Sequence, residues 1–416
     1  MLRPSAFYNT GMNSAPPIEV DAGGQSPLGM SPAQFLACYW QRRPLLIRNA
    51  FPGFVSPISP DELAGLACEP AALARIVRRE RLAAGDDPAQ SRWHLQSGPF
   101  DESDLTRLPE RDCSLLVQDV DKWDADVAPL LDVFAFLPRW RIDDIMISFA
   151  EPGGSVGPHV DQYDVFLLQA HGRRRWQIDS RANADTRLRS DSELKLLQHF
   201  TPDADWLLQP GDMLYLPPGM PHHGEAVDAC LTISVGMRAP AAGELISDLA
   251  EHLAEAMTES ERYRDSDLAP AKDPFEIDAA AIARLRTALG PLGSLDEHAL
   301  RDWFGKFITR YRSAALPDAG GKAKTSESLA KLLNEGRVLT RHPFARSAWT
   351  RIGRRARLFI AGESWAMGVR SASVLSATRA IDATVFAALD DAARSALSQL
   401  LARGWYQLQP KPRPRP

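Results

Sequence analysis

Short apolar runs separated by glycine- and proline-containing turns dominate the middle of the chain. Residues 165–168 (VFLL), 213–216 (MLYL) and 231–235 (LTISV) are each bounded by turn residues, such as the Pro-Pro-Gly at 217–219. Runs of this length with such boundaries indicate β-strands, and the run 165–168, the turn at 171–172 and the strand ending at 176–178 predict a β-hairpin. Many short strands of this kind are typical of a small closed β-barrel or a two-sheet jelly roll.

Helical patterns flank this β-rich region. Before it, the segments SP at 31–32 and SPDE at 59–62 predict helix starts, the second as a capping box with proline at the first helical position. After it, apolar residues recur near the helical period in 241–257, and further helices are expected at 278–289 and 295–311. Residues 326–408 predict helix, strand, helix and strand, with helical sequence at 382–401. Residues 1–25 should be loosely ordered, and 315–324 should form a linker.

Composition narrows the class of protein. A chain of 416 residues has room for two or three domains, and a hydrophobic fraction of 44% is ample for packed cores. The four cysteines lie without disulfide or metal-site spacing, which favours a reducing cytoplasm, and neither a signal-peptide core nor an apolar run of membrane-spanning length is present. A net charge of −5 is untypical of a dedicated nucleic-acid-binding protein but weakly favours basic partners. We therefore expect a cytoplasmic protein.

Two histidines and an aspartate form the candidate metal site. His159 and Asp161 stand two positions apart in an extended segment, so both side chains can point to the same side, and His222 follows a later turn. An H-x-D triplet alone is more often an ordinary surface pair, but here a glycine- and proline-rich entry precedes it and strands follow it. Two imidazoles and one carboxylate on one face of a metal leave positions open for a co-substrate and O₂, as an Fe(II) centre requires.

The region from about residue 139 to 240 resembles the JmjC-type cupin oxygenases, and in particular the bacterial ribosomal oxygenases. The resemblance rests on five blocks in the family's order: WRIDDIMISF, PGGSVGPHVDQYDVF, GRRRW, PGDMLYLPPGMPH and SVGMRAP. It implies an Fe(II)- and 2-oxoglutarate-dependent dioxygenase that uses O₂ to hydroxylate a ribosomal protein. The bacterial branch acts on an arginine of large-subunit ribosomal protein sixteen.

The resemblance also implies an α+β fold in three parts. A JmjC catalytic domain with a double-stranded β-helix (jelly-roll or cupin) is expected at 1–240, with an N-terminal cover at 26–117 and a barrel core at 118–240. A helical dimerisation region is expected at 241–314, where Trp303, Phe304, Phe307 and Ile308 would suit a buried interface of a homodimer. A winged-helix domain is expected at 325–410. Its arginines at 351, 354, 355 and 357 could touch RNA, although such a cluster is more often a solvated face.

Carried over position by position, the family motif assigns roles to single residues. His159, Asp161 and His222 match the iron ligands. Arg174 matches the residue that pairs with the far carboxylate of 2-oxoglutarate, and strand parity agrees, because an inward Arg174 turns its two arginine neighbours outward. Ser148 matches a hydroxyl donor to the same co-substrate.

The substrate positions and one ligand are less uniquely determined. Ser234 resembles a substrate contact, and a carboxylate for a cationic substrate is expected at Asp143, by resemblance, or at Asp144, by parity with Ser148. Where relatives carry an acidic residue after the second histidine, this chain has His223. Adjacent side chains of an extended segment face opposite ways, so the register favours His222 as ligand and His223 at the rim or surface, with the reverse assignment open.

Three functions are compatible with these residues. The first is a ribosomal-protein arginine hydroxylase, and the second is a JmjC oxygenase of another target, such as a histidine of a ribosomal protein or a lysine. The third is a non-catalytic cupin that acts as a binding module in ribosome assembly. A complete triad together with Arg174 argues against the third, because a pure binding module needs neither.

Overall fold

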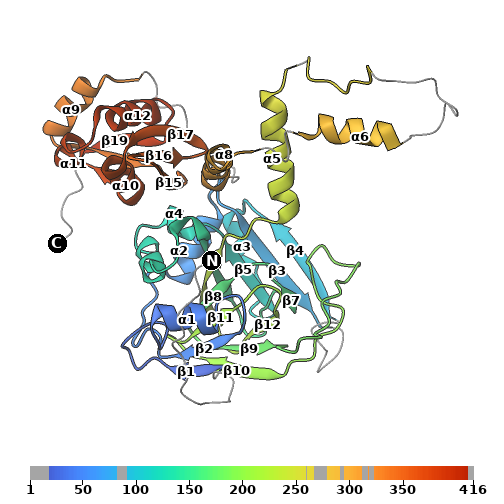
Figure 1. Ribbon diagram of the computed structural model, residues 1–416. Coiled ribbons are helices and arrows are strands. Elements are labelled where there is room, and N and C mark those ends of the chain that lie inside the picture. Colours follow the sequence, from blue (N-terminus) through green and yellow to red (C-terminus); the bar gives the residue numbers. More distant parts are fainter. Residues whose placement is uncertain are drawn as a thin grey trace, which may run out of the picture. The chain divides into compact units, whose positions relative to one another are not determined.

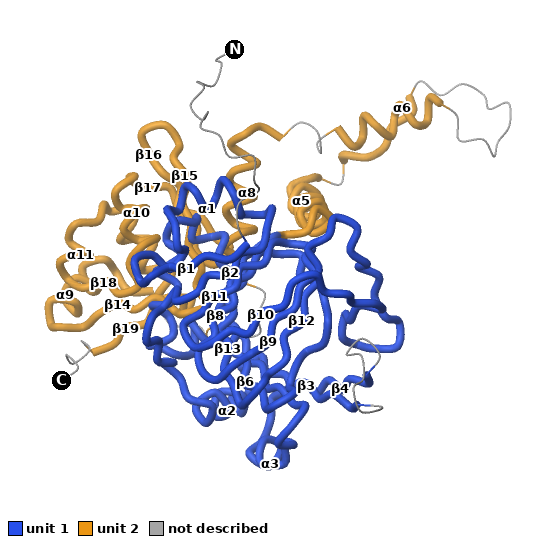
Figure 2. The backbone as a smooth tube through the Cα atoms, turned by 90° about the horizontal axis from the view of Figure 1, so that it is seen from below, with its two compact units in different colours: residues 1–239 blue, residues 240–416 orange. Residues whose placement is uncertain are grey.

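The computed structural model describes residues 18–81, 91–258, 260–266, 279–290, 295–311, 317 and 323–410. It divides into two compact units, residues 1–239 and 240–416 (Figure 2). None of the described helices is long and apolar enough to cross a membrane. The predictions for residues 1–17 and for most of the linker at 315–324 lie outside the described residues.

Two β-sheets form the first unit (Figure 1). The larger sheet has the strand order β1-β2-β11-β8-β13-β6-β5-β3-β4, and the smaller has the order β10-β9-β12-β7. The larger sheet comprises β1 (Glu19–Asp21), β2 (Leu45–Arg48), β3 (Ala74–Glu80), β4 (Arg92–Ser97), β5 (Cys113–Val117), β6 (Ile142–Ala150), β8 (Val165–His171), β11 (Met213–Leu216) and β13 (Cys230–Met237). The smaller comprises β7 (His159–Val160), β9 (Arg174–Ile178), β10 (Ala204–Leu208) and β12 (Pro221–Ala226).

The predicted hairpin of residues 165–178 is wrong in its pairing. The strands β8 and β9 follow each other along the chain, but β8 pairs with β11 and β13 whereas β9 pairs with β10 and β12. From β6 to β13 the chain passes repeatedly from one sheet to the other, as in a jelly roll, and only β9 and β10 are consecutive strands of one sheet. The expectation of loose order at the N-terminus is also wrong for residues 19–21, which pair as β1 with β2 in parallel.

Alternation of side chains along the strands divides the interior of this unit into two apolar layers. On β8, Phe166 and Leu168 join the large core that also contains Phe35 and Tyr215, whereas Val165 and Leu167 join a smaller core with residues of β9 and β11. This is the period of two expected for a strand buried on both faces. The larger sheet thus carries a helix-covered face and a second face toward the smaller sheet.

Helices cover the larger sheet, and the first turns of two of them are capped as the sequence predicts. They are α1 (Pro32–Cys38), α2 (Pro60–Ala67), α3 (Glu102–Thr106) and α4 (Val120–Trp123), with 3₁₀ turns η1 (Ala128–Phe134) and η2 (Arg139–Arg141). Ser31 caps α1, and Ser59 and Glu62 form a complete capping box on α2. Phe35 of α1 packs 5.0 Å from the ring of Tyr215, which ties this helix to the sheet.

The second unit begins with long helices and ends in a small α+β domain. Its helices are α5 (Ala242–Ala256), α6 (Ala279–Ala288), α8 (Glu297–Thr309), α9 (Ser326–Asn334), α10 (Val369–Ala377), α11 (Ala383–Ala387) and α12 (Asp391–Ala402). Strands β14 (Arg337–Arg341), β18 (Ala380–Ile381) and β19 (Tyr406–Pro410) form one three-stranded sheet, and β15 (Ser347–Ile352), β16 (Arg355–Ile360) and β17 (Glu363–Gly368) form another. The sequence did not reveal β14, β15, β17, β18 or α10.

The aromatic residues of α8 are not free for a partner, contrary to the prediction. Trp303, Phe307 and Ile308 are at most 5% exposed and pack within their own chain, against Leu245 and Leu249 of α5. A buried carboxylate fixes this contact, because Asp248 accepts hydrogen bonds from the indole of Trp303 (3.0 Å) and from Arg310 (2.9 Å). These side chains therefore stabilise the α5–α8 packing itself.

Candidate active site

A cavity of about 220 Å³ lies between the two sheets of the first unit. All eight residues selected from the sequence line it: Asp143, Asp144, Ser148, His159, Asp161, Arg174, His222 and Ser234. Thr232, Tyr163 and Trp176 also line it and were not selected. The fold thus brings together in one cavity side chains as far apart in sequence as Asp143 and Ser234.

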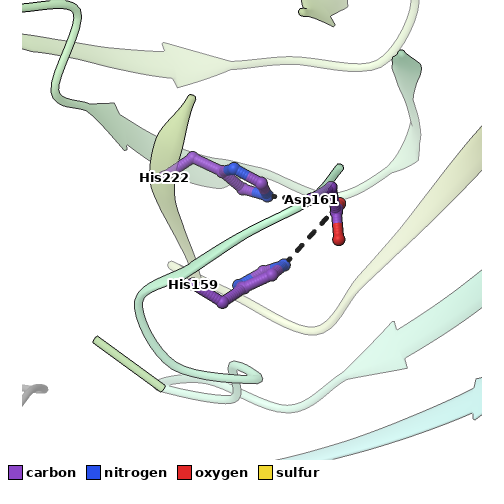
Figure 3. Close-up of side chains that lie close together, drawn as sticks. All are labelled: His159, Asp161 and His222. Atoms are coloured by element: carbon purple, nitrogen blue, oxygen red, sulfur yellow. Dashed lines mark ion pairs between the residues drawn. The ribbon is translucent and has the colours of Figure 1, made fainter. Parts of the chain in front are cut away.

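His159, Asp161 and His222 line this cavity, and their side chains point toward one another (Figure 3). The register of β12 against β7 sets His222 directly opposite His159. The Oδ2 atom of Asp161 lies 3.9 Å from Nε2 of His159 and 3.7 Å from Nε2 of His222. One nitrogen or oxygen atom of each residue lies within 4.8 Å of the others, so a single ion could reach all three.

Backbone contacts orient both imidazoles. Nδ1 of His159 lies 2.9 Å from the carbonyl oxygen of Gly157, and Nδ1 of His222 lies 2.8 Å from that of Met220. A carbonyl oxygen can only accept, so each Nδ1 carries the proton and each Nε2 presents its lone pair to the site. Burial lowers the pKa of His222, which keeps that ring neutral and able to bind a metal.

The structure corrects the prediction for His223. This residue is 2% exposed and does not lie at the rim or surface. Its neighbour His222 lines the cavity, whereas His223 points to the opposite face of β12, where the ring of Phe200 lies 6.2 Å away. Burial, reinforced by the nearby charge of Arg79, lowers the pKa of His223 to about 3. The outer face of β12 is covered at His223, which a strand pattern alone does not reveal.

A buried aspartate anchors the loop that carries Asp161. Asp164 is fully buried and accepts hydrogen bonds from the hydroxyl of Tyr215 (2.7 Å) and the side-chain amide of Gln41 (3.0 Å). Arg141 lies 3.3 Å from the same carboxylate and forms an ion pair with it. These contacts join the loop to the larger sheet and to the end of α1, so they limit the movement of Asp161.

Arg174 is a buried cation without a carboxylate partner among the described residues. It is 3% exposed, and its guanidinium donates to the Ser148 hydroxyl (3.4 Å), the Thr232 hydroxyl (3.4 Å) and the Gly224 carbonyl (3.2 Å). Its Nε has no hydrogen-bond partner, and burial lowers the pKa of the group. A buried charge with neutral contacts alone is unfavourable, so Arg174 is poised for an anion.

The arginines that flank Arg174 point the other way, as parity predicts. Arg173 is paired with Asp228 at 2.8 Å and Arg175 with Asp205 at 2.5 Å, both on the outside of the sheet. Only Arg174 of the three lines the cavity.

Thr232 adds a second hydroxyl group beside that of Ser148. It stands opposite Ser148 in the β13–β6 pairing and donates to the buried amide oxygen of Gln169 at 3.2 Å. Parity could have found it, because Thr232 lies two positions before Ser234 on one strand. Ser148, Thr232 and Arg174 together form a polar floor suited to a carboxylate.

Acidic residues form another part of the cavity wall. Both Asp143 and Asp144 line the cavity, because the pairing of β13 with β6 shifts between Gly236 and Met237 and leaves Asp143 as the extra residue of a bulge. The backbone N–H of Asp119 donates to Asp144 at 3.2 Å. Burial raises the pKa of Asp144 to about 7, opposed by the charge of Lys122.

These contacts define what the cavity can hold. The two-imidazole, one-carboxylate donor set and the open space beside it suit a divalent metal such as Fe(II) that binds further ligands. The Arg174 floor suits the carboxylate of a small dianion, whose other end could reach the metal. The acidic wall suits a cationic substrate group. The residues therefore fit the metal and co-substrate expected from the sequence.

Comparisons with known proteins agree with this geometry. The JmjC domain family matches residues 129–245, and a ROXA-like winged-helix family matches residues 292–407. The Escherichia coli (strain K12) ribosomal protein uL16 3-hydroxylase is 38% identical over 307 residues, which cover 74% of this chain and 79% of that protein.

Solved structures extend the match to the whole fold. The crystal structure of E. coli YcfD is 34% identical with a TM-score of 0.77, covering 92% of this chain and 99% of that one. A structure of the same ribosomal oxygenase in complex with cobalt and 2-oxoglutarate is also 34% identical, with a TM-score of 0.74 and the same coverage. The predicted α+β fold, a JmjC jelly roll followed by a winged helix, is confirmed.

Proposed function

The chain belongs to the bacterial ribosomal oxygenases of the JmjC type. From this we propose that it hydroxylates an arginine side chain of uL16, a protein of the large ribosomal subunit. The enzyme class is that of 2-oxoglutarate-dependent oxygenases that use Fe(II) and O₂. The observation that carries the proposal is the single cavity that joins a His-Asp-His triad, a buried arginine without a carboxylate partner among the described residues, and an acidic wall.

We propose that His159, Asp161 and His222 hold the iron and that Arg174 holds the far carboxylate of 2-oxoglutarate. When bound, the metal and co-substrate supply the oxidative decarboxylation of 2-oxoglutarate to succinate and CO₂, with one oxygen atom inserted into a substrate C–H bond. The two backbone-bonded imidazoles keep their Nε2 atoms directed at one point, so no reorientation is needed on metal binding. The planar fork of Arg174 can donate two parallel hydrogen bonds to a carboxylate.

Asp144 and Asp143 are proposed to bind the guanidinium of the substrate, with Ser234 as a neutral hydrogen-bonding neighbour. Without a bound substrate, burial raises the pKa of Asp144 to about 7, although the charge of Lys122 opposes this shift. An arriving guanidinium would favour the charged form, so substrate binding and deprotonation of Asp144 should be coupled. The bulge of β6 brings two adjacent carboxylates to the cavity, which suits a group with several N–H donors better than a single-donor target.

A histidine or lysine target is the second candidate. A lysine ammonium would also be attracted by the acidic wall, but it cannot use two carboxylates in a planar, bidentate manner. A neutral histidine would gain less from these charges. A non-catalytic binding module is disfavoured, because a buried unpaired Arg174 is unfavourable in a protein that never binds an anion there.

The target residue is tested with three matched uL16 peptides that carry arginine, lysine or histidine at the hydroxylated position. Succinate release and tandem mass spectrometry are measured with Fe(II), 2-oxoglutarate and ascorbate. The proposal expects an added oxygen on the arginine peptide only. An added oxygen on the histidine peptide alone would replace this proposal with the second candidate.

We also propose that the chain forms a homodimer through α5 and α6. Large apolar side chains on these helices are exposed, with Ile246 at 66%, Ile282 at 40% and Leu285 at 45%. Light scattering should give twice the chain mass for the wild type and a lower mass for Ile246→Glu. An unchanged mass of one chain in both proteins would exclude this association. The cytoplasmic location stays a prediction.

A further inference from the structure

Positive charge is concentrated at the C-terminal end of the chain. Residues 325–410 contain twelve arginines and lysines against six aspartates and glutamates, a formal charge of +6 in a chain whose total is −5. The remainder of the chain is therefore strongly acidic. A local excess of this size attracts polyanions to the winged-helix part even though the whole protein is acidic.

The densest part of this charge lies on the hairpin of β15 and β16. Ile352 pairs with Arg355, so Gly353 and Arg354 form a two-residue turn, and Gly353 adopts the positive φ of 57° that such a turn requires. Arg351, Arg354 and Arg355 are all exposed at this end of the hairpin. The pairing of β16 with β17 brings Gly368 opposite Arg355, and the exposed Arg370 follows two positions later.

The three arginines of the turn differ from those exposed arginines of the first unit that form ion pairs. In the first unit, Arg173 and Arg187 are each paired with an aspartate, at 2.8 and 2.6 Å. Within the described part of the chain, the guanidinium groups of Arg351, Arg354 and Arg355 have neither a carboxylate nor another hydrogen-bond partner.

The fourth arginine of the predicted cluster behaves differently. Arg357 lies 2.9 Å from Asp302 and is only partly exposed, so it contributes to the packing of α8 on this sheet. On the same helix, Arg301 donates to the backbone carbonyl of Arg351 at 3.5 Å and so lies beside the turn. The turn residues are thus held at a fixed place by a packed sheet, while their own charges remain free.

We propose that the β15–β16 turn, with Arg351, Arg354 and Arg355, is a binding surface for the phosphate backbone of RNA. Each guanidinium can donate two hydrogen bonds to one phosphate, and a rigid hairpin presents the three groups together. The contact should not depend on base sequence, because the exposed side chains of the turn, Arg351, Arg354 and Arg355, are all charged. It is independent of the proposed hydroxylation.

A membrane surface fits this region less well than RNA. Binding to an anionic bilayer combines basic side chains with exposed apolar ones that enter the headgroup region. Among the described residues of 323–410, no large hydrophobic side chain is exposed. The only apolar side chain in the turn, Ile352, is half-buried.

The test measures the anisotropy of a fluorescein-labelled 20-nucleotide RNA of mixed sequence with the full-length chain at several salt concentrations. The triple variant R351Q/R354Q/R355Q should bind about tenfold or more weakly at low salt. Each phosphate contact contributes about 0.7 to the slope of log affinity against log salt for a single strand, so the slope should fall by about 2.

A matched control removes three positive charges that already have carboxylate partners. R173Q/R181Q/R187Q changes the net charge by the same amount on the first unit, where each arginine is paired with an aspartate. Its RNA affinity should stay within about twofold of the wild type. Melting temperatures of all three proteins verify that each is folded.

Three results would overturn the proposal. The first is equal loss of affinity in the turn variant and the control, which would reduce the effect to net charge. The second is wild-type binding to vesicles with anionic lipids, or to polyglutamate, as tight as binding to RNA. The third is no binding of RNA by the wild type even at about 50 mM salt, where phosphate contacts are strong.

Discussion

Replacement of Arg174 by methionine separates a binding role from a structural one. Methionine is a long, flexible and uncharged side chain that can fill the space of the arginine. In the protein without 2-oxoglutarate, the variant loses three hydrogen bonds of 3.2–3.4 Å to neutral acceptors. Each such bond contributes about 1 kcal/mol to stability, but the unfavourable burial of an unpaired cation, worth several kcal/mol, is removed as well.

These two effects oppose each other, so the free energy of unfolding without co-substrate should change by no more than about 2 kcal/mol in either direction. Affinity for 2-oxoglutarate should fall much more. Removing one partner of a buried, hydrogen-bonded charge pair costs about 2–5 kcal/mol, which corresponds to roughly 30-fold to several thousand-fold in Kd. Arg174→Lys keeps the charge but loses the planar guanidinium, so its affinity for 2-oxoglutarate should lie between those of the wild type and Arg174→Met.

The assay is a thermal melt with Mn(II) and increasing 2-oxoglutarate, supported by calorimetric titration. The wild type should gain melting temperature with co-substrate, whereas Arg174→Met should keep a near-normal starting temperature and gain almost nothing. A variant that is severely destabilised without co-substrate but retains the wild-type Kd would refute the assigned role and make Arg174 a structural residue.

Three further predictions concern neighbouring parts of the site. In Gly224→Ala, the added Cβ would lie 2.8 Å from Nε of Arg174, so the variant should lose about 1–3 kcal/mol of stability by chemical denaturation and raise the KM for 2-oxoglutarate; an unchanged KM would contradict the contact. Because the folded-state pKa of Asp144 is raised from 3.8 to about 7, the folded protein holds a proton there that the unfolded chain has lost, and stability falls as pH rises between these values; Asp144→Asn should therefore melt higher than the wild type at pH 8, with the gain vanishing near pH 4. His222→Ala should lose metal binding by titration calorimetry, whereas His223→Gln should retain it; the opposite pattern would reverse the ligand assignment.

Part of the catalytic fold follows from local patterns. Apolar runs between turns identified the positions of β8, β11 and β13, and capping residues identified α1 and α2. Pairing partners did not follow, because a period of two determines which face a side chain occupies but not which strand lies alongside. The same limit explains why β8 and β9 were taken for a hairpin.

The metal site could be predicted because its spacing has a geometric meaning. A separation of two along an extended segment brings His159, in β7, and Asp161, directly after β7, to one side, and parity separated Arg174 from its arginine neighbours. Parity failed for Asp143, where a bulge shifts the register. The burial of His223 was missed because it depends on residues outside its own strand, such as Phe200.

The C-terminal unit was less predictable for a similar reason. Aromatic residues on α8 were assigned to an interface, yet Trp303 and Phe307 pack inside the chain against α5, and Trp303 donates a hydrogen bond to the buried Asp248. A helical stripe of apolar residues indicates burial but not whether the partner belongs to the same chain.

The most direct test of the central claim is the intact mass of uL16 after incubation with the purified protein, Fe(II), 2-oxoglutarate and ascorbate, with His222→Ala in parallel. The iron site with open positions predicts a gain of one oxygen, about 16 Da, with the wild type only. No change in mass with either protein, and no succinate formed, would contradict the assignment of this cavity to an oxygenase.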